Sequence, residues 1–371
     1  MRVLLFTRSL DTGGAERQLV LLAKSLHKRG IPVAVMVHYG GGAFGLDLER
    51  AGIAIIDLKK TGRWDVFGFA FRTVSAIRMY NPDVVYTFIG AHLVVTVLWA
   101  LVGRPAIVWG IRASDMDLSY YDWFSRFNEY CSKRFSRFSD AIICNSEAGR
   151  THIIEQGYFT RSITVIPNGI DTVRFRTDVA LRQMRGHSWS IPSKSYVIGM
   201  MGRIDPMKDH ANFLSAAKLV CSQVENVYFI CVGSGPEPLQ KSLMHHAESL
   251  GIADRLLWAG QSDNPTADYA GFDILVSASM TEAFPNVIGE SMACGLPVVA
   301  TDVGDCRQIV GDCGWIVPPK NPEALARAIL QALEALPQWP HERSRQRVIE
   351  HFSVDAMVDR TLAVFESVVR T

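Results

Sequence analysis

Short runs of β-branched and other apolar residues alternate with longer segments of helical periodicity along almost the whole chain. This alternation is typical of parallel sheets whose strands are joined by crossover helices, so we predict an α/β fold. The first series of predicted strands covers 3–6, 33–37, 53–56, 84–87, 107–110, 142–144 and 164–166. The second series covers 196–201, 227–232, 256–259, 274–277, 298–300 and 315–317, and a last helix is predicted over 354–369.

Between the two series the periodic signal lapses in a polar stretch. This stretch contains Gly186, Ser188, Ser190, Pro192 and Ser193. The two arrays have similar length, which predicts two doubly wound domains that face each other, with the join near Pro167-Asn168-Gly169. Ligands of such sheets bind beyond the carboxyl ends of the strands, so we expect the site in a cleft that both domains share.

The composition is that of an ordinary globular protein: 371 residues, of which 48% are hydrophobic and 20% charged. Disorder, collagen and coiled coil are excluded, and the length exceeds what one core usually holds. The 38 Lys and Arg residues nearly balance the 37 Asp and Glu residues, so we do not expect nucleic acid as a partner. The residues through Asp171 include 20 basic and 15 acidic side chains, a small excess that favours an anionic surface.

Cysteine usage and apolar runs indicate the compartment. The seven cysteines include no C-x-x-C pair and no zinc-like spacing, which is typical of buried thiols in a reducing environment. The apolar stretch before Arg8 is shorter than a secretory signal, and the longest apolar run, 93–102, is far shorter than the roughly 20 residues of a membrane span. We therefore expect a cytoplasmic protein that does not cross a membrane.

A glycine pair, Gly13-Gly14, follows the first predicted strand and opens a helix. Glycine lets the backbone approach a ligand, and the unpaired N–H groups of a helix start attract an anion such as a phosphate. The alternative is a tight turn that needs glycine only for its conformation. The G-x-G-x-x-G pattern of a dinucleotide fold is absent, which argues against a dehydrogenase.

Two cations, Arg203 and Lys208, lie five residues apart in the loop after the predicted strand 196–201. Such a pair can bind one diphosphate, with Arg as a bidentate donor and Lys as a point charge, and can stabilise the charge on a departing nucleotide. The alternative is two solvated loop cations.

Two carboxylates, Glu282 and Glu290, follow the predicted strand 274–277. Glu282 lies in the loop, and Glu290 is predicted inside a helix that Pro285 introduces. Their separation suits two parts of one extended ligand, and paired sugar or ribose hydroxyls are natural partners for such acceptors. Taken singly, each is as well explained by a surface position or by the helix dipole.

Together these segments resemble the retaining glycosyltransferases of the GT-B fold, in particular glycosyltransferase family 4. The resemblance runs through nearly the whole chain. The four similar segments are Gly13-Gly14-Ala15-Glu16-Arg17, the connection Val165 to Phe175, Gly202-Arg203 with Lys208, and Glu282 and Glu290 with seven residues between them, followed by Gly295 to Thr301. Each motif is weak alone, and four in the right order and separation are specific.

The resemblance implies a fold of two Rossmann-like doubly wound parallel-sheet domains around a central cleft. Residues 1–168 would form the acceptor-side domain, on which 352–371 packs back, and 169–351 the donor-binding domain. Glu282 would contact the donor sugar, Glu290 the ribose, and Arg203 and Lys208 the diphosphate. The backbone of Gly13 and Gly14, and the N–H groups near Phe284, Asn286 and Val287, would add to the anion site. No metal or other cofactor is implied, because cations and helix ends supply the positive charge.

The acceptor side departs from the family pattern. Many relatives carry a histidine after the strand corresponding to 107–110, whereas this chain has Arg112 and Asp115 in that loop. His92 is a candidate replacement, although a lone histidine beside an apolar run is more often a packed helix residue. Arg112 or Asp115 would otherwise orient the acceptor.

Residues 120–140 combine aromatic and basic side chains at helical spacing. The apolar members are Phe124, Phe127, Cys131, Phe135 and Phe138, and the cations are Arg126, Lys133, Arg134 and Arg137. This pattern is typical of a helix that contacts an anionic membrane, which would suit a lipid-linked acceptor. A stripe that faces the core, with solvated cations, is the alternative.

The sequence thus predicts a retaining, metal-independent hexosyltransferase that uses a nucleotide-diphosphate sugar, expected to be UDP-linked. Its acceptor would be a glycan or a lipid-linked sugar in surface polysaccharide biosynthesis. A sugar-nucleotide epimerase on the same fold and a catalytically silent subunit that binds a sugar nucleotide remain the alternatives.

Overall fold

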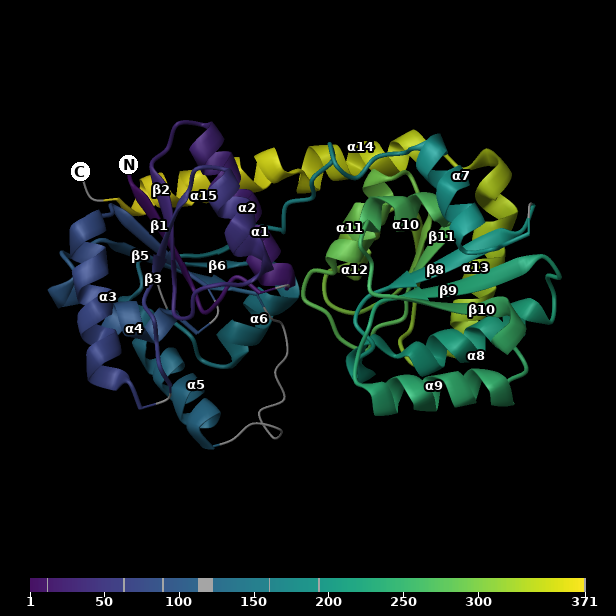
Figure 1. The fold of residues 1–371 in the computed structure, drawn as a ribbon, viewed down its shortest axis with the longest axis horizontal. Helices are drawn as coiled ribbons and strands as arrows, with labels where there is room; N and C mark the ends of the chain where they lie inside the picture. The colour runs from purple at the N-terminus through teal and green to yellow at the C-terminus, as the bar shows by residue number, and fades with distance from the viewer. Residues whose placement is uncertain are drawn as a thin grey trace. The chain divides into compact units, whose positions relative to one another are not determined.

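A computed structural model describes residues 1–11, 13–62, 64–88, 90–112, 123–159, 161–192 and 194–369, without the side chains of 123–127 and 187 (Figure 1). The chain forms two compact units. The first unit comprises Met1–Gly169 and Val354–Thr371, and the second comprises Ile170–Ser353. Each unit is built around its own parallel sheet.

The first sheet has seven parallel strands in the order β3-β2-β1-β4-β5-β6-β7. Its strands are β1 Val3–Thr7, β2 Val33–Val37, β3 Ala54–Asp57, β4 Val84–Thr87, β5 Ala106–Ile111, β6 Ala141–Cys144 and β7 Ile163–Val165. The helices of this unit are α1 Gly14–Lys28, α2 Ala43–Arg50, α3 Val66–Tyr80, α4 His92–Val97, η1 Trp99–Leu101, α5 Trp123–Phe135, η3 Ser136–Phe138, α6 Glu147–Glu155 and α15 Val354–Val368.

The central strands of the first sheet are buried on both faces, as expected of a parallel sheet covered by helices. One face packs against α1 and α15, and the other packs against α3 and α4. The last helix therefore belongs to the first unit, where the Phe365 ring lies 5.4 Å from the ring of Tyr86 on β4.

The second sheet has six parallel strands in the order β10-β9-β8-β11-β12-β13. Its strands are β8 Tyr196–Met201, β9 Val227–Val232, β10 Leu256–Gly260, β11 Ile274–Ser277, β12 Val298–Thr301 and β13 Gly314–Val317. The helices of this unit are α7 Val179–Ser188, η4 Pro206–Lys208, α8 His210–Cys221, α9 Glu237–Ser249, η5 Ala253–Arg255, α10 Pro265–Gly271, α11 Asn286–Ala293, α12 Cys306–Val310, α13 Pro322–Ala335, η6 Leu336–Gln338 and α14 His341–Phe352.

Helix α7 corrects the expectation that the polar stretch after the first array lacks regular structure. It packs against α10, where Arg185 forms an ion pair with Asp268 at 2.9 Å. The Trp189 ring, just beyond α7, stacks on Phe272 at 5.5 Å between ring centroids. These tertiary contacts hold α7 in place against the second unit.

The chain passes between the units twice, at neighbouring points. It leaves the first unit after Gly169 and returns after Ser353. The two passages are joined by a parallel bridge between Ile170 and Ser353, with Ile170 N donating to Phe352 O at 2.7 Å. The packing is close, because a side chain on Gly169 would lie 2.9 Å from the Cα atom of Val354.

Candidate active site

In each sheet the strand order reverses beside the first strand of the array. In the second sheet β8 lies between β9 and β11, so the loops that follow β8 and β11 leave the same edge side by side. This is the point at which doubly wound sheets bind ligands. The predicted residues of the second unit lie on these two loops and on the helix that follows β11.

An ion pair joins the two loops: Lys208 Nζ contacts Glu282 Oε1. Ser279 Oγ donates a hydrogen bond to the same carboxylate oxygen at 2.7 Å. Both charged side chains are largely buried, with exposed fractions of 23% for Lys208 and 13% for Glu282. The structure therefore brings together two of the predicted catalytic residues and adds Ser279, which the sequence did not single out.

The loop after β8 is held by a glycine-rich loop after β9. Ile204 N donates to Ser234 O at 2.9 Å, and a side chain on Gly233 would lie 1.8 Å from Gly202 O. Gly233 has φ of 146°, so glycine is required there for conformation as well as for space. Gly233-Ser234-Gly235 directly follows a strand, and this sequence pattern could have predicted the supporting loop, but it was not among the motifs identified above.

Lys208 ends the short helix η4, and Asp209 then begins α8. Asp205 caps the short helix by accepting from Met207 N at 2.9 Å, and Asp209, with φ of 49°, accepts from Asn212 N at 3.2 Å. Met280 N donates to Met207 O at 2.8 Å, which ties the loop after β11 directly to η4. The position of Lys208 is thus set by backbone contacts on both sides.

His210, two residues after Lys208, is buried and stacks on Trp258 with 6.3 Å between ring centroids. Burial, reinforced by the positive charge of Lys208, lowers the pKa of His210 to about 4. The imidazole is therefore neutral near pH 7 and adds no charge beside Lys208.

Arg203 differs from Lys208 in its surroundings. Its side chain is exposed, and it forms no ion pair or side-chain hydrogen bond with any other residue that the structure describes. Lys208 is paired with Glu282, and the carboxylates of Asp205 and Asp209 cap η4 and α8, so Arg203 is the cation of this loop that is left without a side-chain partner among the described residues. A side chain on the preceding Gly202 would lie 3.7 Å from Lys208 Cε, which places the two cations on adjoining parts of one loop.

The loop that carries Glu282 is anchored by its backbone. Thr301 Oγ1, at the end of β12, donates to Ser279 O at 2.6 Å, and Asp305 N donates to Ala283 O at 3.0 Å. A side chain on Gly304 would lie 2.2 Å from Glu282 O, and Gly304 has φ of 52°. The carboxylate therefore extends from a loop with little freedom to shift.

Glu290 lies in α11 with 4% of its surface exposed, and its Oε2 accepts a hydrogen bond from Tyr269 OH at 2.8 Å. Tyr269 belongs to α10, and this partner was missed because the two residues are far apart in sequence. The two predicted carboxylates thus differ: Glu282 is ion-paired at the loop, and Glu290 is hydrogen-bonded inside the unit.

The three predicted residues before and at the start of α11 face different ways. Phe284 is buried, with its ring 5.6 Å from Phe352, and Val287 packs partly into the same core cluster. Asn286 is the first residue of α11. Their backbone N–H groups, at the positive end of the helix, are the part of this segment suited to an anion.

Arg345 in α14 holds the other end of α11. Its guanidinium donates to Ala293 O at 2.7 Å, Phe175 O at 2.9 Å and Thr172 O at 2.8 Å. Carbonyl groups at a helix end have no partner within the helix, so a cation there is favourable. The hydrogen bonds to Thr172 O and Phe175 O also hold residues 170–175, with which the second unit begins.

Arg345→Ala should lower the free energy of unfolding by about 2–3 kcal/mol, because three carbonyls lose a charged donor. Arg343→Ala is the matched control, since Arg343 pairs only with the exposed Asp312 among the described residues and its loss should change little. Denaturant unfolding of both variants measures the difference. Equal stability of the two variants would contradict this account of Arg345.

In the first unit the predicted glycine pair lies at the carboxyl end of β1. Gly14 is the first residue of α1, and Gly13 precedes it in an extended conformation without a side-chain cap. The Glu16 carboxylate lies beside Gly13, where a side chain on Gly13 would come within 2.0 Å of its Oε2 unless Glu16 moved. The backbone N–H groups of this helix start are the part of the segment suited to an anion.

His92 is a packed residue at the start of α4. Its Nδ1 is hydrogen-bonded to Thr87 Oγ1 at 2.8 Å, and its ring stacks on Trp109 at 5.1 Å. Burial lowers the pKa of His92 to about 4, so the ring is neutral near pH 7. These contacts fit the packed alternative stated above, and a role toward an acceptor stays a prediction.

Arg112 supports the connection between the units. Its guanidinium donates to Asn168 Oδ1 at 2.8 Å and to Tyr86 OH at 3.0 Å. Gln18 of α1 is buried and forms two hydrogen bonds with Gly169, donating to its carbonyl at 2.9 Å and accepting from its N–H at 2.8 Å. Asp115, the other acceptor-side candidate, lies outside the described residues.

The basic aromatic segment 120–140 is described in part, because 120–122 and the side chains of 123–127 are not. Phe135 packs against the core, whereas Phe138 is 56% exposed and carries the Arg137 guanidinium 5.1 Å from its ring centre. Lys133 donates to Gln156 Oε1 at 2.6 Å. The predicted stripe is thus divided between the core and the surface.

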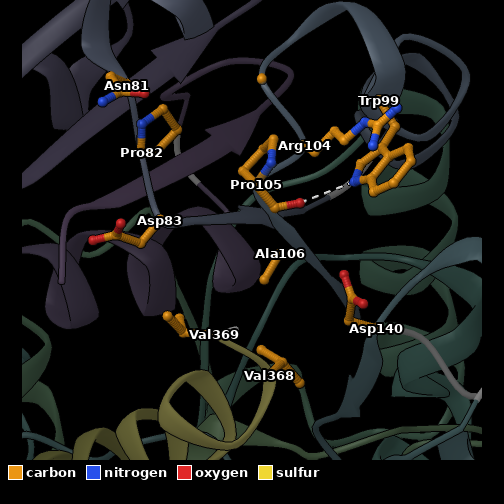
Figure 2. A pocket seen from close by; sticks show the side chains of 11 residues that line it. Asn81, Pro82, Asp83, Trp99, Arg104, Pro105, Ala106, Asp140, Val368 and Val369 are labelled. Carbon is orange, nitrogen blue, oxygen red and sulfur yellow. Dashed lines mark hydrogen bonds between the residues drawn. The ribbon is translucent and has the colours of Figure 1, made fainter. Parts of the chain in front are cut away.

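A cavity of about 200 Å³ lies at the opposite edge of the first sheet, where β4, β5 and β6 begin (Figure 2). Its polar groups serve the fold: Trp99 Nε1 donates to Pro105 O at 3.1 Å, and Asp140 Oδ2 accepts from Ile107 N at 2.8 Å. Asp83 accepts from Arg2 N at 2.6 Å. Ligands of such sheets bind at the other edge, so this cavity is not the candidate site.

Among the described residues, no helix combines the length and the apolar character that a membrane crossing requires. Nor does the described part of the chain group three or more His, Cys, Asp or Glu side chains in a way that could hold a metal ion.

Comparison with protein families finds two matches that follow the two units. Residues 12–174 match the family model described as Glycosyltransferase Family 4, and residues 195–335 match the model described as Glycosyl transferases group 1. The two matches together span both sets of candidate residues.

Similar proteins and solved structures cover from about two thirds to nearly all of the chain. The lipopolysaccharide core biosynthesis glycosyltransferase LpsE of Rhizobium meliloti (strain 1021) is 27% identical over 362 residues, covering 96% of each chain. The lipopolysaccharide core biosynthesis mannosyltransferase LpsB of the same organism is 29% identical over 64% of this chain and 69% of its own. The crystal structure of Anabaena Alr3699/HepE in complex with UDP superposes with a TM-score of 0.86 at 23% identity, covering 99% of this chain and 100% of that one.

Proposed function

Because this chain belongs to glycosyltransferase family 4, we propose that it transfers a hexose-type sugar from a UDP-linked donor to a glycan or lipid-linked acceptor. Its two parallel-sheet units are those of the GT-B fold. The name of LpsE places that relative in lipopolysaccharide core biosynthesis, and similar solved structures contain UDP or UDP-glucose. These relatives support surface polysaccharide biosynthesis as the setting. We propose in addition that the protein acts at the inner face of the cell membrane.

The observation that carries the proposal is the ion pair between Lys208 and Glu282 at the switch point of the second sheet. A lysine ammonium group has three N–H donors, so Lys208 can hold Glu282 and still contact a diphosphate. Arg203 on the same loop would bind the diphosphate as a bidentate donor. Glu282, fixed by Lys208 and Ser279, would then present its remaining acceptor capacity to hydroxyls of the donor sugar.

Glu290 would accept a hydrogen bond from the ribose, oriented by its hydrogen bond with Tyr269. The backbone amides near Phe284, Asn286 and Val287 would add positive potential from the start of α11. In the first unit, the backbone of Gly13 and Gly14 would contact a donor phosphate. His92, Arg112 and Asp115 stay proposed acceptor-side residues, with Arg112 acting through the connection that it holds.

We infer a reaction with retention of configuration, in which the bond between the sugar C1 and the diphosphate oxygen breaks as the acceptor oxygen approaches on the same face. The acceptor proton passes to the departing diphosphate, whose negative charge Arg203 and Lys208 stabilise. Glu282 is engaged by Lys208 and Ser279, which favours an orienting role over that of a nucleophile. The positive charge comes from side chains and helix ends, so we expect activity to persist with EDTA.

Thermal shift with UDP-, GDP- and ADP-sugars tests the proposal, with UDP-sugars expected to give the largest stabilisation. A ligand at about 100 times its dissociation constant adds roughly 2.7 kcal/mol to the free energy of unfolding. Arg203→Ala should weaken this effect by about tenfold in affinity, because a charged hydrogen bond to phosphate is lost.

Two results would change the conclusion. Binding of a UDP-sugar without hydrolysis or transfer would favour the silent subunit, and interconversion of the donor sugar would favour the epimerase. If no sugar nucleotide raised the melting temperature, the proposal would be wrong.

A further inference from the structure

Helix α3 carries three large aromatic side chains that the fold leaves in solvent. Trp64 lies just before the helix and is 86% exposed, and Phe67 and Phe71 are 91% and 75% exposed. Phe67 and Phe71 are four residues apart in the helix and so lie on one side of it, and Trp64 precedes its first turn. We call Trp64, Phe67 and Phe71 the α3 aromatic face.

The opposite side of α3 already supplies its share of the core. Phe69, Thr73, Ala76 and Ile77 are buried on that side, and the apolar ones among them pack on the first sheet. A helix with one buried apolar stripe normally has a polar outer side, and a second apolar stripe indicates that something else covers it. The aromatic face is therefore not explained by the packing of the first unit.

The charge around the aromatic face is strongly biased. Residues 59–80 contain five basic side chains and a single acidic one, Asp65. That carboxylate is already engaged, since it forms an ion pair with Arg72 and accepts from Thr61 N at 3.1 Å. The exposed Lys59 and Arg78 lie in the loop before α3 and in its last turn. Basic side chains therefore outnumber acidic ones in the sequence that contains the aromatic face, although the exposed Asp57 lies just before it.

Further apolar side chains are exposed on the elements that cover the same side of the sheet. Met79 at the end of α3 is 81% exposed, Val97 at the end of α4 61% and Leu101 of η1 51%. Arg78 Nε donates to Leu101 O at 2.7 Å, which links the end of α3 to η1. Exposed apolar side chains are therefore also present on the elements next to α3 in the sequence.

We propose that α3 docks on the surface of an anionic lipid bilayer, with the aromatic face inserted at the level of the headgroups. Tryptophan and phenylalanine on one side of a helix bordered by Lys and Arg are typical of interfacial helices, and anionic lipids attract such cations. The paucity of acidic side chains favours a lipid surface over a protein partner, whose interface would need complementary charges of both signs. The proposal deepens the proposed function, since a lipid-linked acceptor lies at such a surface.

This assignment selects α3 over α5, which lies in the segment 120–140 that the sequence offered as a candidate membrane helix, with a core-facing stripe as its alternative. Of the described α5 and η3 aromatics, Phe135 is in the core and Phe138 is covered on one side by Arg137. Tyr130 and Phe138 are 66% and 56% exposed, less than any member of the α3 aromatic face. They therefore provide a matched control.

Sedimentation of the full chain with phosphatidylcholine vesicles containing about one third phosphatidylglycerol measures the contact. Wild-type protein should bind at low salt and bind less at high salt or to pure phosphatidylcholine. Trp64→Ser/Phe67→Ser/Phe71→Ser should lower the partition coefficient by about tenfold or more, whereas Tyr130→Ser/Phe138→Ser should retain it. Because all five side chains are on the surface, both variants should keep the thermal shift given by UDP-sugar.

Insertion of the aromatic side chains into the bilayer can be measured separately, by quenching of tryptophan fluorescence. Vesicles with brominated acyl chains should quench the tryptophan fluorescence of wild-type protein more than that of Trp64→Phe, which keeps the apolar surface and should still sediment. Failure of wild-type protein to bind would overturn the proposal, as would equal binding by the triple variant or loss of binding in the Tyr130/Phe138 control. Self-association that is abolished by the triple variant, without vesicle binding, would instead assign the face to a second copy. Vesicle binding needs no sugar nucleotide, so its failure is distinct from failure of the proposed function.

Discussion

Lys208→Ala should lower the turnover number by on the order of a hundredfold or more, comparable to the loss of one donor from an oxyanion hole. Lys208 is held between the backbone of η4 and Glu282, so its charge is positioned before the reaction begins. Its effect should be greatest in the transition state, where negative charge develops on the diphosphate. Steady-state kinetics with the best donor from the thermal-shift screen measures this change.

Lys241→Ala provides the control, because Lys241 also pairs with a glutamate, Glu237, but on the exposed side of α9. Its turnover should match that of the wild type. Lys208→Arg should recover part of the activity, since it keeps the charge and changes the geometry. An unchanged turnover number in Lys208→Ala would remove the residue from the mechanism.

Glu290→Gln should weaken donor binding by roughly 10- to 100-fold, because a hydrogen bond to a charged acceptor contributes about 1.5–3 kcal/mol. The substitution preserves the size of a side chain that is 4% exposed, so the packing of α11 should persist. The effect should fall on the affinity for the nucleotide and leave turnover at saturating donor nearly unchanged. Isothermal titration with UDP and with the UDP-sugar measures it.

Tyr269→Phe separates orientation from direct contact. It removes the hydrogen bond that Glu290 accepts at 2.8 Å and leaves the carboxylate in place, so we expect a smaller loss of affinity than in Glu290→Gln. If Glu290→Gln bound UDP as tightly as the wild type, the ribose role proposed for Glu290 would be wrong.

The strands were predictable because each is a short, mainly apolar run, and the central ones are fully buried. Five strands coincide with their predicted ranges, and the ends of the others differ by at most one residue; the five are Val33–Val37, Val84–Thr87, Tyr196–Met201, Val227–Val232 and Ile274–Ser277. The two-unit α/β architecture follows from the alternation of these runs with helices. Helix α7 was missed because its mostly polar residues, with Gly186 and Ser188 near its end, hid the helical pattern.

Motif spacing predicted Lys208 and Glu282, which the structure joins in one ion pair. It could not predict Ser279 or Tyr269 as partners, because these contacts depend on how loops and helices from different strands meet. The requirement for glycine at position 304 is likewise invisible in sequence, since it comes from the approach of Glu282 O across the loops.

The two apolar sides of α3 show a different limit. Periodicity in residues 66–80 indicates a helix, but it does not say which apolar positions the sheet covers. Phe67 and Phe69 are the same residue type two positions apart, but Phe67 is exposed to solvent and Phe69 is buried. A search for a basic aromatic helix therefore selected residues 120–140, where part of the aromatic set is used by the core.

The chain crosses between the two units at Gly169–Ile170 and again at Ser353–Val354, and this determines where the protein can be divided into fragments. A gene fragment that stops at 169 would lack α15, whose Met357, Val358 and Phe365 fill part of the interior beneath α1. Residues 170–353, by contrast, are contiguous and contain every partner named here for Lys208, Glu282 and Glu290. Chimaeras that exchange donor specificity should therefore insert the middle of the gene between both boundaries, and a simple fusion of two halves would leave one of them without its last helix.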